Sequence, residues 1–109
     1  MKAALDALGA LAQESRLSVF RLLVQQGPEG LAAGHIADRL AIPPATLSFH
    51  LSQLGQAGLV TSTRNGRSIV YSADYKGMER LMGFLYENCC EGACIPAAAV
   101  GRKRRSATS

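Results

Sequence analysis

The sequence predicts a mainly α-helical domain that carries one β-hairpin. Two observations support this fold class. Leucines recur at helical spacing, most clearly Leu47, Leu51 and Leu54, which would share one face of a helix. Two runs rich in β-prone residues, 59–64 and 68–73, flank an Asn-Gly pair. This pair strongly indicates a hairpin, because both residues accept the positive φ angles of a type I′ turn.

The first two helices are predicted from their apolar faces. Residues 4–11 place a leucine at every third position, as in a short amphipathic helix. The next helix, over residues 13–27, would stop at Gly27-Pro28, because glycine and proline end helices. The apolar face would carry Leu5, Leu8 and Leu11 in the first helix, and Leu17, Phe20, Leu23 and Val24 in the second.

The middle of the chain predicts two further helices joined by a tight turn, "AIPP". The first of them would carry Leu31, Ile36 and Leu40 on its apolar face. Proline suits the first turn of a helix, so Pro43-Pro44 would open the second one. A short helix with a polar outer face, placed just after such a turn, is typical of a helix-turn-helix. That outer face would carry Thr46, Ser48, Phe49, Ser52 and Gln53.

The predicted hairpin follows directly, and Arg64 and Arg67 flank its tip. A helix-turn-helix followed by a basic hairpin is a winged helix, in which such arginines would contact DNA phosphates. A last helix would start near Asp74, a suitable N-cap, and run to about Cys90. Its apolar stripe would consist of Met78, Leu81, Met82 and Leu85.

These elements resemble the ArsR (SmtB/ArsR) family of metal-responsive bacterial repressors. The resemblance is carried by "ALAQESRLSVFRLL", "SFHLSQLGQAGLV" and "RNGRSIVYS", and it covers residues 5–90. It implies a homodimer that packs through its first and last helices and represses transcription from an inverted-repeat operator. It also implies DNA contacts from the recognition helix and the wing, at Thr46, Ser48, Phe49, His50, Gln53, Arg64, Asn65 and Arg67.

One departure from the family concerns the inducer site. The founding arsenic sensors carry Cys-x-Cys at the start of the helix before the recognition helix, where this chain has Ala32 and Gly34. Other relatives are similar to this chain in a Cys-Cys pair at the end of the last helix and a third cysteine just beyond it. The resemblance therefore implies arsenite sensing at Cys89, Cys90 and Cys94, the only cysteines in the sequence.

The chemistry of three clustered thiols fits that inference. In a reducing compartment, clustered cysteines more often bind metal or act in redox chemistry than form structural disulfides. Three thiolates without a fourth ligand suit a soft ion of low coordination number, such as As(III) or Sb(III). Such an ion would act as an inducer, with no permanent cofactor. A structural zinc ion prefers four protein ligands, and His35 and His50 lie far away in the sequence.

Several alternatives stay open at this point. The same fold could respond to oxidants or reactive sulfur, with Cys90 and Cys94 closing a disulfide, or to Zn or Cd. A small metalloid-binding protein without an operator is a third hypothesis. Catalysis is not expected: phosphatase-like Cys-x5-Arg loops need arginine six residues after a cysteine, and those positions hold Ile95, Pro96 and Val100.

The charge distribution separates a domain from a tail. The net charge is +4, and the run Arg102, Lys103, Arg104, Arg105 accounts for it, since the remaining basic residues equal the eight acidic ones. We expect a winged-helix domain over residues 1–91 and a tail over 92–109, whose basic run would add salt-sensitive attraction to DNA. The sequence has no apolar run of membrane-spanning length, so a cytoplasmic protein is expected.

Overall fold

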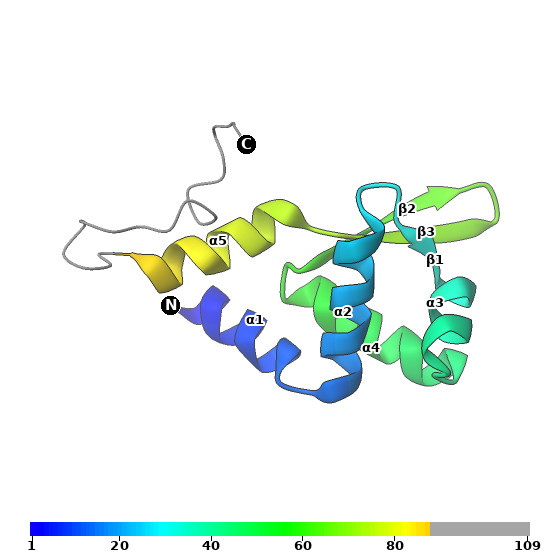
Figure 1. The fold of residues 1–109 in the computed structure, drawn as a ribbon, viewed down its shortest axis with the longest axis horizontal. Helices are drawn as coiled ribbons and strands as arrows, with labels where there is room; N and C mark the ends of the chain where they lie inside the picture. Colours follow the sequence, from blue (N-terminus) through cyan, green and yellow to red (C-terminus); the bar gives the residue numbers. More distant parts are fainter. Residues whose placement is uncertain (88–109) are drawn as a thin grey trace.

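The computed structural model describes residues 1–87, in which five helices and three short strands form a helical body with a projecting wing (Figure 1). The strands pair antiparallel in the order β1-β3-β2. The expected fold class, a mainly helical winged helix-turn-helix, is confirmed. The elements are α1 (Lys2–Leu11), α2 (Glu14–Gln26), β1 (Leu31–Ala32), α3 (Ala33–Leu40), α4 (Pro44–Gln56), β2 (Val60–Asn65), β3 (Ser68–Ala73) and α5 (Tyr75–Tyr86).

The core lies where α2, α3 and α4 meet. Leu23, Ile36 and Leu54, one from each helix, have no exposed surface, and Leu47 and Leu51 are almost fully covered. The leucine stripe predicted for α4 therefore faces inward. Burial of each such side chain stabilises the fold by about 1.5–3 kcal/mol, so this stripe fixes which face of α4 remains outside.

The segment before α3 differs from the prediction. Leu31 was expected in the helix, but it lies in β1, paired with Tyr71 of β3, and α3 begins at Ala33. Gly30, directly before β1, has a φ of 72°. A Cβ at Gly30 would collide with the Tyr71 carbonyl oxygen. The close approach of these two backbones adds a third strand to the wing, and only glycine permits it.

The hairpin turn is displaced by one residue from the predicted position. Asn65 pairs with Ser68 inside the ladder, so the two loop residues are Gly66 and Arg67. Gly66 has a φ of 67°, whereas Asn65 keeps a negative φ. Glycine at the first central position is the requirement of a type II′ turn rather than type I′. Arg67 consequently lies in the turn itself.

The last helix starts as predicted. The Asp74 carboxylate is the N-cap and accepts a hydrogen bond from the Gly77 backbone N–H at 3.0 Å. The helix ends at Tyr86, earlier than expected, with Glu87 as its C-cap. The predicted domain boundary at residue 91, the tail and the cysteines lie outside the described residues. None of the helices in residues 1–87 is long and apolar enough to cross a membrane.

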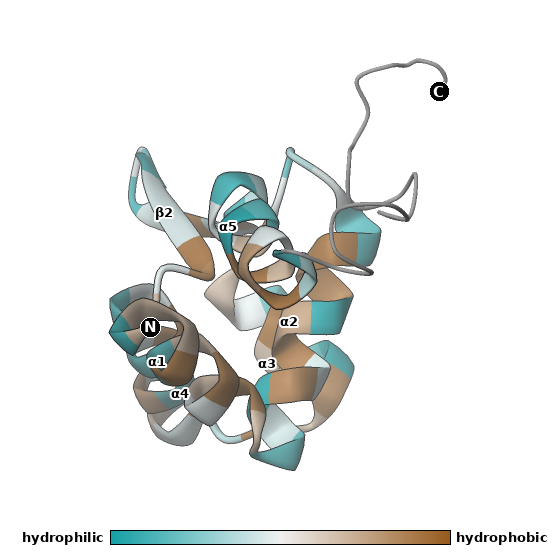
Figure 2. Cartoon of the chain, turned by 90° about the vertical axis from the view of Figure 1, so that its left-hand side faces the viewer, coloured by the Kyte–Doolittle hydropathy of each residue, from teal (hydrophilic) through white to brown (hydrophobic). Residues whose placement is uncertain are grey.

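The apolar faces of α1 and α5 are largely uncovered in the single chain. Ala4 and Ala7 are the buried residues of α1, whereas Leu5 and Leu8 of its predicted apolar face are 59% and 41% exposed. Small alanines let α1 pack against α5, which turns the leucines outward. Figure 2 views the molecule from this side, with hydrophobic residues visible on both helices. The other exposed apolar side chains nearby are Leu17, Met82, Phe84 and Leu85.

Candidate nucleic-acid interface

The second helix of the helix-turn-helix, α4, presents a polar outer surface. It is preceded by Ala41, a residue in the left-handed conformation that ends α3, and it opens on Pro44 at its first position. Because the leucine stripe faces the core, the opposite side of α4 faces solvent. Of the residues predicted to lie on this side, Gln53 is half-buried and the others are exposed: Thr46, Ser48, Phe49 and Ser52.

No Asp, Glu, Lys or Arg occurs in α4, whose sequence is PATLSFHLSQLGQ. Its exposed hydroxyl and amide groups can donate to and accept from base edges, and the Phe49 ring, 58% exposed, can contact a thymine methyl group. Positive charge comes from neighbouring elements instead. Arg64 and Arg67 of the wing are exposed, and so is Arg39 near the end of α3, which sequence reasoning did not single out.

His50 lies apart from the other predicted contact residues, because it is buried on the inner side of α4 with 7% of its surface exposed. Its Nδ1 atom lies 3.4 Å from Nη1 of Arg16, and the Nε atom of Arg16 donates to the Ala10 carbonyl oxygen at 2.8 Å. Burial first, and the Arg16 charge second, lower the pKa of His50. A neutral His50 that accepts from Arg16 thus ties α4 to the end of α1, and its ring does not reach the outer surface.

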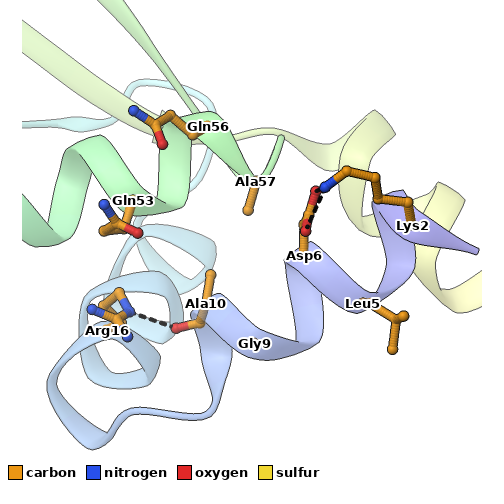
Figure 3. A pocket seen from close by; sticks show the side chains of 9 residues that line it. All are labelled: Lys2, Leu5, Asp6, Gly9, Ala10, Arg16, Gln53, Gln56 and Ala57. Atoms are coloured by element: carbon orange, nitrogen blue, oxygen red, sulfur yellow. Dashed lines mark hydrogen bonds and ion pairs between the residues drawn. The ribbon is translucent and has the colours of Figure 1, made fainter.

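Two hollows flank α4. The first, the α1–α4 hollow, has a volume of about 480 Å³ and is bounded by Lys2 and Asp6 of α1, Arg16 of α2, and Gln53 and Gln56 of α4 (Figure 3). The second, the α4–wing hollow, has a volume of about 400 Å³ and lies between α4 and the sheet. Hydroxyl groups dominate its polar lining, from Ser48, Ser52, Thr61, Ser62 and Tyr71.

The structure describes no metal centre in residues 1–87, where no group of three or more His, Cys, Asp or Glu side chains could hold an ion. Ala32 and Gly34, the positions matching the founding arsenic sensors, are the N-cap and second residue of α3, and they offer no ligand. Cys89, Cys90 and Cys94 follow α5 in the sequence, beyond the described part of the chain.

Comparison with known families and proteins gives consistent relatives. A model for a helix-turn-helix domain matches residues 11–63. The chain is 32% identical to the nodulation protein NolR of Rhizobium meliloti, over 72% of this chain and 62% of NolR. It is 34% identical to a putative arsenical resistance operon repressor ArsR of Halobacterium salinarum, over 71% of this chain and 59% of that protein. It is 32% identical to the transcriptional activator HlyU of Vibrio cholerae, over 72% of this chain and 73% of HlyU.

Solved structures share the fold. An ArsR-like transcriptional regulator from Rhodococcus sp. RHA1 has a TM-score of 0.72 at 27% identity, covering 83% of this chain and 82% of its own. A homodimeric winged helix-turn-helix domain from Mycobacterium bovis, from a possible ArsR-family regulator, has a TM-score of 0.66 at 28% identity, over 77% of this chain and 75% of that one. The chain spans about three fifths of the length of NolR and of the archaeal ArsR. The ArsR, HlyU and Rhodococcus relatives are transcriptional regulators rather than enzymes. The chain belongs to the ArsR family of winged helix-turn-helix regulators.

Proposed function

We propose that this chain is a homodimeric repressor that binds an inverted-repeat operator and leaves it when As(III) or Sb(III) binds Cys89, Cys90 and Cys94. The observation that carries the DNA-binding part is the uncovered polar face of α4 beside a wing tipped by Arg64 and Arg67. Short polar side chains on such a helix reach base edges, while arginines hold the phosphates.

The proposed contact set follows the exposure of the side chains. His50 is left out, because its ring is buried and its Nδ1 atom is occupied by Arg16. The set consists of Thr46, Ser48, Phe49 and Gln53 of α4, with Arg64, Asn65 and Arg67 of the wing.

Dimerisation is supported by the uncovered apolar residues of α1 and α5. Leu5 and Leu85 are each more than half exposed, and Leu8, Met82 and Phe84 are exposed by more than a third. An apolar surface of this kind on a small soluble domain marks an interface. The homodimeric relative from Mycobacterium bovis is consistent with the same assembly. Two copies of α4 would then enter successive major grooves roughly 34 Å apart.

The position of the thiols supports the regulatory part. Cys89 follows Tyr86, the last residue of α5, after only two residues. Since α5 also carries the exposed Met82 and Leu85, an ion that gathers three thiolates would act next to the proposed dimer surface. A change in α5 would alter the separation of the two α4 helices. By linkage, DNA must weaken arsenite binding by the same factor that arsenite weakens DNA binding.

The experiment first selects binding sites from a randomised duplex library with reduced wild-type protein. Fluorescence anisotropy then follows release of a labelled selected duplex during titration with arsenite, zinc chloride or hydrogen peroxide. Cys89→Ser, Cys90→Ser and Cys94→Ser are titrated in parallel, and each must bind DNA normally before any addition.

Release by arsenite in wild type, lost in each variant, would support the proposal. Release by peroxide that needs Cys90 and Cys94 but not Cys89 would replace it with a redox sensor. If zinc releases the DNA and arsenite does not, zinc would be the inducer in place of arsenite. A selection that enriches no duplex would overturn the repressor function itself.

A further inference from the structure

The α1–α4 hollow is lined by groups that suit a single anionic oxygen cluster. Figure 3 shows that its side chains come from three helices: Lys2 and Asp6 from α1, Arg16 from α2, and Gln53 and Gln56 from α4. Lys2 and Arg16 carry positive charge against the single negative charge of Asp6, and both amides can donate hydrogen bonds. A hollow with this lining favours a phosphate group over an apolar ligand.

The place of the hollow relative to α4 points to DNA as the source of that phosphate. An α-helix with its side chains is about 10–12 Å wide and fills a major groove of about 12 Å, so both sugar-phosphate strands run along its flanks. The two hollows lie beside α4, one towards α1 and one towards the sheet, and Gln56 lines both. Recognition helices contact bases with their N-terminal residues. The α4–wing hollow borders α4 from Ser48 onward and the α1–α4 hollow from Gln53 onward, where the groove rim would lie.

We infer that the α1–α4 hollow binds a backbone phosphate of one DNA strand, through Lys2, Arg16 and the amides of Gln53 and Gln56. This inference rests on the proposed DNA-binding function and adds α1 to its contact surface. Gln53 then positions the protein on the backbone instead of reading a base.

Arg16 is already held in place for this contact. Its Nε atom donates to the Ala10 carbonyl oxygen at 2.8 Å, and its Nη1 atom lies 3.4 Å from His50 Nδ1. These bonds fix the guanidinium plane and leave the third nitrogen as a donor. A donor fixed in advance loses little conformational entropy when it binds, which favours the contact.

To bind the phosphate, the Lys2 side chain must leave its ion-pair partner, Asp6. Its Nζ atom lies 3.2 Å from an Asp6 carboxylate oxygen, but the two side chains are 88% and 51% exposed. Pairs this exposed contribute little to stability, so a phosphate can take the ammonium group from Asp6. Asp6 would repel the same phosphate. The inference therefore makes opposite predictions for two neighbouring residues of one helix.

The test measures anisotropy of a labelled duplex selected as above, and of an unrelated duplex of equal length, between 50 and 200 mM NaCl at about neutral pH. Lys2→Ala is compared with Lys76→Ala, and Asp6→Asn with Glu79→Gln. Lys76 and Glu79 are exposed residues of α5 that line neither hollow. The two variants of each pair change the net charge by the same amount, so they differ only in the place of the change. Thermal melts check that all four variants fold.

Lys2→Ala should weaken binding by about eightfold per lost phosphate contact at 0.1 M salt and reduce the salt slope by about 0.9 per contact. The loss should be equal on both duplexes, because phosphate contacts carry no sequence information. Asp6→Asn should tighten DNA binding. Lys76→Ala should not weaken it, and Glu79→Gln should not tighten it.

Equal effects of Lys2→Ala and Lys76→Ala, with DNA binding intact, would overturn this inference and leave the proposed function standing. A loss confined to the selected duplex would mean that the hollow reads a base, which also overturns it. If the library enriches no duplex, the proposed function and the inference fail together.

Discussion

Substituting Gly77 by alanine tests how closely α5 packs on the rest of the domain. A Cβ at Gly77 would collide with the backbone carbonyl oxygen of Gly58, in the turn between α4 and β2. That oxygen cannot swing aside like the end of a flexible side chain, so α5 itself must shift. Overpacking of this kind costs about 1–3 kcal/mol of unfolding free energy.

Gly34→Ala is the matched control. Gly34 is also in the first turn of its helix, and nothing lies within 4 Å of the Cβ it would gain. Both variants gain the helix propensity of alanine, worth up to about 1 kcal/mol, so the difference between them isolates the collision at Gly77.

Urea unfolding followed by far-UV circular dichroism, at one protein concentration and with reduced thiols, gives both free energies. We expect Gly34→Ala to equal or exceed wild type, and Gly77→Ala to fall about 1–3 kcal/mol below Gly34→Ala. Equal stabilities would refute the close approach of α5 to the turn.

Substitutions at three further positions give distinct results. Asp74→Ala removes the cap bond to the Gly77 N–H and should lower the unfolding free energy by about 1 kcal/mol in urea, whereas Asp74→Asn should retain most of it. Because burial and Arg16 lower the pKa of His50 in the folded chain, the unfolded chain binds more protons. Wild-type stability should therefore fall as the pH drops below about 6.5, and His50→Gln should remove that part of the pH dependence in thermal melts. Ala41→Gly relieves a left-handed backbone, with a φ of 55°, that costs alanine about 1–2 kcal/mol, so it should raise the melting temperature; a lower value would show that chain entropy outweighs that relief.

The sequence was sufficient for elements whose signals are local. The leucine stripe of α4 predicted its buried face, because helical periodicity alone decides which residues point inward. Asp74 predicted the start of α5, because a cap bond spans only three residues. The hairpin was predicted for the same reason, although its turn is one residue later than expected.

Features that depend on distant partners were missed. Leu31 was predicted in a helix, and it belongs to a strand only because Tyr71, forty residues later, pairs with it. His50 was placed on the DNA side, but it is buried and lies beside Arg16 of another helix. The leucines of α1 fit a helix pattern equally well facing the core or facing a second copy. Periodicity identifies an apolar face but not what covers it.

The absence of formal charge from α4 has a practical consequence for engineering. Its exposed residues can be exchanged for other neutral ones without altering the net charge near the DNA, since Arg39, Arg64 and Arg67 lie on other elements. We expect libraries varied at Thr46 and Ser48 to yield regulators with new target sequences and similar ionic-strength tolerance. A family of orthogonal switches that share one inducer could be built on this scaffold.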